Sequence, residues 1–405
     1  MSVSDAQPGQ ATTDRPPAHL VAGRGLLLVV AVVLTAMNLR PAITSVGPVL
    51  DQVRGSLGAS PTWAGLLTTI PVLCFAVAGP LAPAVARRVG TAATIAGALA
   101  VLAAGILLRA VGGAAVVLGA TLVAAAGIAF VAVLMPVVVK SSYPAKVGVM
   151  TGVYTAALQF GAVLGFALTP PLATVMHGWR PALATWAGLA VLALVVWSIA
   201  ARRGGAAPPG AASTAKGTSL LRSPLAWTVT VFFGLQALIA FVAISWLPQV
   251  LMSAGVSRDD AGLLLALLSF LALPVSLLVP PMAARRGGQS GWILGLGLTG
   301  MAGLLGLLLA PAAAPLLWVV LLGLGMSVFS LALTVIALRA STSEQTAKLS
   351  GMAQGFGYLI AATGPFLFSL LHELTGGWTA PLSMLIGVLV VQIVVGVFAG
   401  RPRTV

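Results

Sequence analysis

The sequence has few charged residues: they make up 7% of its 405 residues, whereas a soluble domain carries about 25%. Hydrophobic residues make up 59%, so the chain cannot cover a water-facing surface with polar groups. Apolar runs of about 20 residues recur between positions 25 and 400, each long enough to cross a hydrocarbon core of about 30 Å. The runs are continuous rather than alternating, which argues against a spanning β-barrel. We therefore predict an all-α, multi-pass membrane protein.

Acidic residues, histidine and cysteine are also scarce, with seven Asp and Glu, three His and one Cys. The acids and histidines all fall in tails or near the ends of apolar runs. A membrane-embedded enzyme needs a nucleophile with a base, or a metal cluster, at cavity depth. Cys74 alone cannot form a disulfide or a cysteine-based metal site within one chain. We expect no enzymatic activity, no metal and no cofactor, and proton coupling through an embedded carboxylate is disfavoured.

The formal charge of +14 does not indicate nucleic-acid binding, because the basic residues lie in short connections between apolar runs rather than in one patch. With the N-terminus inside, sixteen Lys and Arg fall on the inner side. The outer side holds only Arg54, Arg109, Arg180 and Arg258. Basic residues concentrate in cytoplasmic loops, so both termini are predicted to be cytoplasmic, in a protein of the cytoplasmic (inner) membrane.

The apolar runs predict twelve transmembrane helices in two bundles. Their approximate ranges are 25–49, 62–85, 91–111, 114–139, 149–174, 181–200, 224–250, 261–284, 290–310, 315–338, 349–372 and 378–400. A Gly-, Ala- and Pro-rich segment after the sixth run is typical of a flexible linker. The predicted division is a disordered cytoplasmic tail (1–24), an N-terminal six-helix bundle (25–200), a cytoplasmic linker (201–223), a C-terminal six-helix bundle (224–400) and a short tail (401–405).

The two halves carry a same-direction repeat. G-A-S-P-T-W-A-G-L-L at 58–67 resembles G-V-S-R-D-D-A-G-L-L at 255–264, at an offset of 197 residues. Arg-Arg pairs follow at an offset of 198, and Gly-Trp pairs at 199. A nearly constant offset indicates two bundles of the same topology that face each other across a central path.

Several segments resemble the major facilitator superfamily and, within it, the cyanate and 2-nitroimidazole transporter family (CynX/NimT). They are N-L-R-P-A-I-T-S-V-G-P at 38–48, A-G-L-L-T-T-I-P-V-L at 64–73, V-L-M-P-V-V-V-K at 133–140, S-W-L-P at 245–248, A-G-L-L-L-A-L at 261–267 and M-A-Q-G-F-G-Y-L-I-A-A-T-G-P at 352–365. The resemblance implies alternating-access transport of small anions or small nitroaromatics. In one departure, the loop after the second helix lacks the acid that superfamily members often carry there.

Arg40 is the residue that sequence alone singles out, because it is the only ionisable side chain that we place well inside a span. A charge at that depth costs at least about 2.5–3.5 kcal/mol, so it should face a cavity or a partner. Pro41 cannot donate to the carbonyl of Met37 and should break the helix beside Arg40. A guanidinium suits a small oxyanion or a nitro group. The alternative is a structural arginine that reaches the interface or bonds to carbonyls.

Other polar or aromatic residues inside the spans are weaker candidates for contact with substrate, and interhelical hydrogen bonding explains them equally well. Two pairs, Thr155 with Gln354 and Gln159 with Tyr358, are related by the repeat. The predicted binding set is Arg40, Asn38, Tyr154, Thr155, Gln159, Gln236, Trp246, Gln354 and Tyr358. The predicted set for helix breaks and gating is Pro41, Pro136, Arg87, Arg88, Arg285 and Arg286.

These observations favour a secondary transporter for a small anionic or strongly polar solute, such as a cyanate-like anion or a small nitro or azole compound. A broad-specificity exporter of drugs or metabolites with the same fold is the alternative. A transporter-like sensor would usually carry a soluble signalling domain, and we expect none. The expected partners are the small-molecule substrate and the lipid bilayer, and the protein is expected to be a monomer.

Overall fold

The computed structural model describes residues 18–203, 220–285 and 287–405, and within these ranges all regular structure is helical. Twelve helical segments of the described chain are long and apolar enough to cross a membrane, which confirms the predicted number. The first half contains α1 (Ala18–Met37), α2 (Pro41–Thr44), η1 (Gly47–Val49), α3 (Leu50–Leu57), α4 (Pro61–Val89), α5 (Thr91–Val111), α6 (Ala114–Ser142), η2 (Pro144–Lys146), α7 (Val147–Val175), α8 (Trp179–Ala184) and α9 (Trp186–Arg202). The second half contains η3 (Leu220–Arg222), α10 (Pro224–Ser253), α11 (Arg258–Arg285), α12 (Ser290–Leu309), α13 (Pro315–Met326), α14 (Val328–Arg339), α15 (Ser343–Thr375) and α16 (Thr379–Ala399).

The predicted N-terminal tail (1–24) overlaps this first helix. Helix α1 begins at Ala18, so residues 18–24 are helical where a disordered tail was expected. The stretch Ala-His-Leu-Val-Ala-Gly-Arg lacks proline, and its Ala and Leu favour helix, so the helix of the apolar run extends back through it. Residues 1–17, and 204–219 of the predicted linker, lie outside the described part of the chain.

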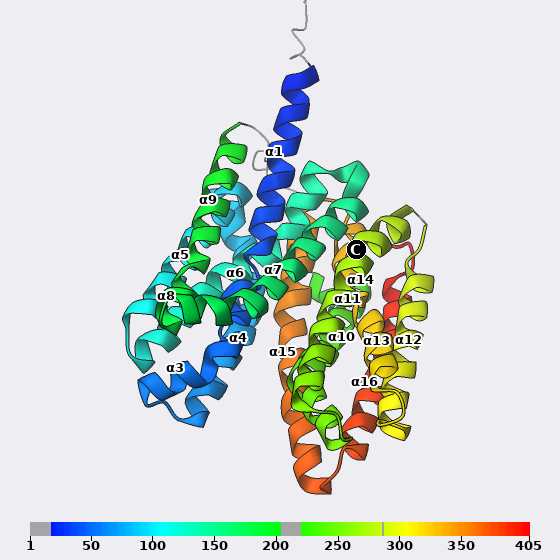
Figure 1. Ribbon diagram of the computed structural model, residues 1–405. Coiled ribbons are helices and arrows are strands. Elements are labelled where there is room, and N and C mark those ends of the chain that lie inside the picture. Colours follow the sequence, from blue (N-terminus) through cyan, green and yellow to red (C-terminus); the bar gives the residue numbers. More distant parts are fainter. Residues whose placement is uncertain (1–17, 204–219, 286) are drawn as a thin grey trace, which may run out of the picture.

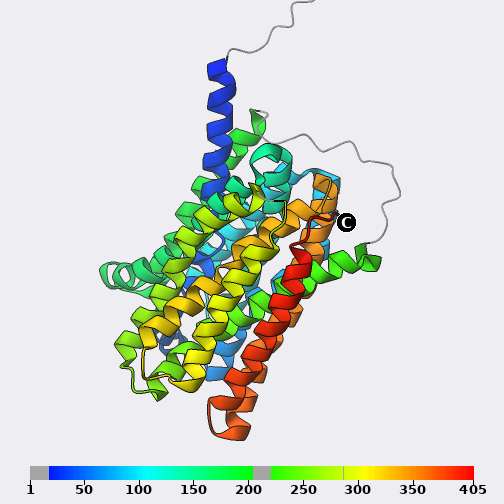
Figure 2. The same ribbon diagram turned by 90° about the vertical axis from the view of Figure 1, so that its right-hand side faces the viewer.

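The helices form two bundles that stand side by side, one from α1 to α9 and the other from α10 to α16 (Figures 1 and 2). We call the linker end the end of the molecule at which α9 finishes and α10 starts. The C-terminus lies at this end too, where the backbone N–H of Val405 donates to the carbonyl of Arg339 at 2.9 Å. We call the other end of the bundles the opposite end.

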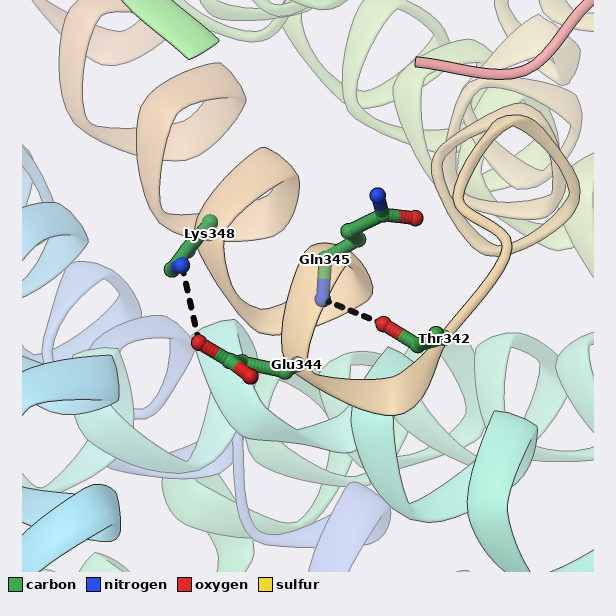
Figure 3. Close-up of polar contacts among 4 residues, drawn as sticks. All are labelled: Thr342, Glu344, Gln345 and Lys348. Carbon is green, nitrogen blue, oxygen red and sulfur yellow. Dashed lines mark hydrogen bonds and ion pairs between the residues drawn. The ribbon is translucent and has the colours of Figure 1, made fainter. Parts of the chain in front are cut away.

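Short polar side chains fix where several helices begin. Ser60 caps α4 by accepting a hydrogen bond from the N–H of Trp63 at 3.2 Å. Thr342 caps α15 in the same way, accepting from the N–H of Gln345 at 3.1 Å (Figure 3). These caps satisfy N–H groups that a helix start leaves without a partner. The first turn of α15 also carries a Glu344–Lys348 ion pair of 2.8 Å, which is partly exposed and therefore contributes little to stability.

The two bundles touch closely on the linker side of their centre. Gly79 on α4 packs directly against Gly351 and Gly355 on α15, so that a Cβ built on Gly79 would lie 2.4 Å from the Gly351 carbonyl oxygen. On the other side of the interface, a Cβ on Gly148 of α7 would lie 2.6 Å from the carbonyl oxygen of Pro280 on α11. Small residues at both crossings let the backbones approach to a distance that larger side chains would prevent.

Candidate functional site

The first membrane span is interrupted at the position that the sequence predicted. Helix α1 ends at Met37, and the one-turn helix α2 starts at Pro41 with Arg40 as its N-cap. Pro41 has no N–H to donate to the Met37 carbonyl, and it disfavours helical continuation at the residue before it. Helix α7 packs on the break through Gly161, where a Cβ would lie within 3 Å of the Met37 carbonyl oxygen. The break is therefore buried in protein, as irregular backbone at membrane depth must be.

A cavity of about 410 Å³ lies between the two bundles, and Arg40 lies in its wall. The break after α1, the helices α2 to α7 and the helices α10, α11 and α13 to α15 contribute to it, and most of the lining is apolar. The volume falls in the range typical of sites for small molecules, about 300–1,000 Å³. None of the described lining residues is acidic, and the charged ones are Arg40 and Arg109.

The Arg40 guanidinium faces the other bundle. Its Cζ lies 6.0 Å from the ring centroid of Phe329 on α14, within the range of a cation–π contact. The side chain is only partly buried, so the guanidinium remains accessible from the cavity. No ion pair to Arg40 is found in the described part of the chain. An accessible, unneutralised cation in an apolar cavity is suited to bind an anion or a strongly dipolar group.

Aromatic rings surround the part of the cavity nearest the linker end. The Tyr358 ring on α15 lies 4.5 Å from Phe75 on α4 and 6.1 Å from Phe241 on α10, measured between centroids. Tyr154 on α7 also lines the cavity, is 2% exposed, and its hydroxyl has no hydrogen-bond partner among the described residues. These rings offer flat apolar walls together with a free hydroxyl group.

One turn from Tyr358 along α15, towards the linker end, polar contacts join the bundles. Gln354 Nε2 donates to the carbonyl of Ala132 on α6 at 3.1 Å, and the Ser350 hydroxyl donates to the carbonyl of Val133 at 2.7 Å. One turn further lies the contact of Gly79 with Gly351. The cavity lining instead continues towards the opposite end through residues such as Leu50, Leu67 and Ile244. The central site is thus closed on the linker side.

Arg109 on α5 is a second buried cation, which the sequence analysis missed. It was counted among four outer-side topology residues, but its side chain is only 1% exposed and lines the cavity. Its Nη1 donates to the carbonyl of Ala42 in α2 at 2.8 Å, whereas Nε and Nη2 have no hydrogen-bond partner among the described residues. The sequence analysis therefore gave Arg109 only a topological role, whereas the structure places its side chain in the wall of the cavity. The signal available was the position of Arg109 within the apolar run 91–111.

The structure brings five of the nine predicted binding residues to the cavity. They are Arg40, Tyr154, Gln159, Gln354 and Tyr358. The repeat-related pair of Gln159 and Tyr358 thus meets at one cavity, from α7 and α15 respectively.

The other four predicted binding residues lie elsewhere. Asn38 is 3% exposed and donates to the carbonyls of Leu34 and Leu189, which anchors the break to α9. The Thr155 hydroxyl donates back to its own helix at 2.8 Å. Gln236 Nε2 donates at 2.7 Å to the carbonyl of Met326, where α13 ends. All three side chains donate hydrogen bonds within their own bundle. This agrees with the alternative stated in the sequence analysis, in which such polar residues hydrogen-bond to the protein instead of contacting substrate.

The indole of Trp246 packs away from the cavity, in an aromatic cluster near the opposite end. Its ring lies 6.1 Å from Phe368 and 6.1 Å from Trp378. His372 stacks on Trp378 with centroids 3.8 Å apart, completing the cluster. Trp246 therefore packs within the second bundle rather than at the central site.

The residues predicted for breaks and gating fall into two groups. Pro41 begins α2, and Pro136 lies buried within α6. Arg87 and Arg88 lie exposed in the last turn of α4, and Arg285 lies exposed in the last turn of α11. Arg286 lies outside the described residues.

Two six-helix bundles around a central cavity that is closed on one side define a membrane transport protein. Comparison with known proteins gives the family. The model of the Major Facilitator Superfamily matches residues 26–365, and the chain belongs to this superfamily. Transporters of this kind bind a small-molecule substrate within the bilayer and move it unchanged, so the protein is a multi-pass membrane transporter and not an enzyme.

Curated relatives cover almost the whole chain. The uncharacterized transporter YycB of Bacillus subtilis (strain 168) is 39% identical over 93% of this chain and 94% of its own length. The 2-nitroimidazole transporter of Escherichia coli (strain K12) is 36% identical over 94% of this chain and 97% of its own length. The cyanate transport protein CynX of the same organism is 31% identical over 87% and 91%. The resemblance to the CynX/NimT family is thereby confirmed.

The fold has solved counterparts. The structure of the proton:xylose symporter XylE bound to 6-bromo-6-deoxy-D-glucose superposes with a TM-score of 0.77, covering 95% of this chain and 98% of that one. At 14% sequence identity this likeness shows the fold alone.

Proposed function

We propose that the protein is a secondary transporter that moves a small anionic or strongly polar solute across the cytoplasmic membrane by alternating access, with Arg40 as its principal binding group. The observation that carries the proposal is an accessible guanidinium in a largely apolar cavity, where none of the described lining residues is acidic. Relatives whose names give 2-nitroimidazole and cyanate as the transported compound narrow the class to small anions and small nitro or azole compounds.

Several features of the geometry support this proposal. Arg40 and Tyr358 approach the cavity from different bundles, so one bound solute can contact both. Closure on the linker side rests on few polar contacts and on glycine packing, which can separate without breaking the core of either bundle. With both termini in the cytoplasm, as the distribution of Lys and Arg favours, the described conformation is open towards the outside. The two bundles of one chain together line the cavity, which favours a functional monomer.

A screen of the purified full-length protein tests the substrate class. Thermal unfolding is measured with a panel of small anions (cyanate, nitrate, formate), with 2-nitroimidazole, and with bulky aromatic drugs. A ligand that binds only the folded state raises the unfolding temperature according to its affinity. We expect stabilisation by members of the first two groups, and none by the drugs. The reverse pattern would favour the broad-specificity exporter.

A variant of Arg40 tests the site. Arg40→Lys keeps the charge but loses the planar fork of donors, and Arg40→Gln loses the charge. Both should remove the stabilisation by the small solutes without loss of folded protein, because few protein contacts depend on the guanidinium. Arg222→Gln is the matched control, because Arg222 is exposed and belongs neither to the cavity lining nor to the predicted gating set, and it should behave like the wild type.

A further inference from the structure

Arg109 presents an unexplained feature of the cavity wall. A side chain with this charge is seldom buried without being fully paired, because removing a charge from water is costly unless hydrogen bonds replace the lost solvation. Arg109 is 1% exposed, yet in the described structure only Nη1 has a hydrogen-bond partner, the carbonyl of Ala42. Its Nε and Nη2 groups have none.

The position of Arg109 relates it to Arg40. The two arginines flank the same four-residue helix, since Arg40 is the N-cap of α2 and Ala42 is its second residue. Both line the same cavity, and Arg109 lies near the end of α5 that faces the opposite end. The unpartnered donors of Arg109 and the guanidinium of Arg40 therefore belong to the wall of one cavity.

The charge balance of the cavity also favours an anionic ligand. Two guanidiniums line it, and the described lining offers no carboxylate to offset either one. Thr121, on the facing helix α6, also lines the cavity, but its hydroxyl accepts no hydrogen bond from Arg109 Nε or Nη2, which have no partner among the described residues. A hydroxyl in any case neutralises no charge. An anionic ligand can supply the compensating charge.

We propose that Arg109 is a second anion-binding residue of the cavity, and that the site accepts an organic anion with two acceptor groups, one bound at Arg40 and the other at Nε and Nη2 of Arg109. The inference rests on the proposed function, because it places the second group beside the Arg40 site. Arginine is suited to this role, since its fork of donors binds a carboxylate in two-point geometry. The bond from Nη1 to Ala42 leaves the Nε and Nη2 edge free for this purpose.

The test uses matched anions that differ only in a second carboxylate. Affinities of the purified full-length protein are measured for benzoate against phthalate, isophthalate and terephthalate, and for acetate against malonate. The three ring isomers sample different carboxylate spacings. In the wild type, at least one dicarboxylate should bind about tenfold or more tightly than its monocarboxylate, as expected for one added charge-assisted contact.

Substitution of Arg109 separates binding from a purely structural role. In Arg109→Gln the preference for the dicarboxylate should fall to about onefold, while monocarboxylate affinity is retained. Arg109→Lys keeps the charge and a donor towards Ala42, and should retain part of the preference. Arg180→Gln is the control, because Arg180 lies at the same end, donates to the carbonyl of Gly112, and is not part of the cavity lining. It should leave the preference unchanged.

Three results would overturn the proposal: no dicarboxylate preference in the wild type, a preference that survives in Arg109→Gln, or an equal loss in Arg180→Gln. If Arg109→Gln does not fold, the wild-type series and Arg109→Lys still decide, because a lysine variant with an unchanged isomer profile would show that the guanidinium fork is not used. Arg40→Gln reports separately on the proposed function. Monocarboxylate binding that is unaffected in Arg40→Gln contradicts the Arg40 site, whatever the behaviour of Arg109.

Discussion

Substitution of Gly79 by alanine should shift the protein away from the described conformation. Gly79 packs against α15 with no room for a side chain: an added Cβ would lie 2.4 Å from the Gly351 carbonyl oxygen and 2.5 Å from Gly355 Cα. Contacts below 3.0 Å with backbone atoms cannot be relieved by a side-chain rotation, so α4 and α15 must separate. Overpacking of this kind costs about 1–3 kcal/mol. The cost applies only to conformations in which these helices touch, so the equilibrium should shift by about 5- to 150-fold.

Distance measurements across the linker end can detect this shift. Spin labels at Arg88 and Ser341, both exposed, report the separation of α4 and α15 when Cys74 is replaced by serine. In the parent protein we expect a dominant short-distance population. Gly79→Ala should transfer most of it to a longer distance and slow transport.

The control for this experiment is Gly97→Ala on α5. A Cβ at Gly97 would meet nothing within 4 Å, so alanine should improve helix propensity there and leave the distances unchanged. The reasoning is refuted if Gly79→Ala gives the same distance distribution and transport rate as Gly97→Ala.

Three further substitutions test other contacts. Ser350→Ala removes the 2.7 Å hydrogen bond from Ser350 to the Val133 carbonyl, which joins the bundles. The loss of about 0.5–1.5 kcal/mol should raise the longer-distance population by about 2- to 10-fold in the same spin-label measurement. Gln236→Leu leaves the Met326 carbonyl without its donor, so the free energy of unfolding, measured by chemical denaturation in detergent, should fall by about 1–3 kcal/mol. Gln236 does not line the cavity, so no contact with substrate is removed directly. Tyr154→Phe removes a hydroxyl that has no partner among the described residues, so the unfolding temperature should hold while solute affinity falls by about 3- to 10-fold in a binding titration.

The architecture was predictable because its signals are long and repeated. Continuous apolar runs gave the twelve spans, and the dipeptide Arg40-Pro41 predicted the break between α1 and α2. Breaks without a proline were missed. The span expected over 315–338 is divided at Ser327 into α13 and α14, where the Ser327 hydroxyl donates back to the Gly323 carbonyl at 2.9 Å. Serine and glycine are so common in apolar helices that neither marks a break in the sequence.

The candidate site was predictable only in part, because sequence gives the depth of a residue but not the direction in which it points. Gln159 and Gln236 are both amides inside spans, yet only Gln159 lines the cavity. Helices that are apolar on all sides have no polar face from which the orientation could be inferred. Arg109 was missed for a related reason: it lies two residues from the end of the run 91–111, where an arginine is ordinarily expected to extend to the membrane surface.

The most direct test of the role of Arg40 is counterflow of labelled solute in proteoliposomes. Vesicles are loaded with the unlabelled compound that raises the unfolding temperature most, and uptake of its labelled form is followed for the wild type, Arg40→Lys and Arg222→Gln. We predict rapid transient accumulation in the wild type and in Arg222→Gln, and none above protein-free vesicles in Arg40→Lys. Accumulation by Arg40→Lys at the wild-type rate would contradict the assignment of this guanidinium as the group that binds the transported solute.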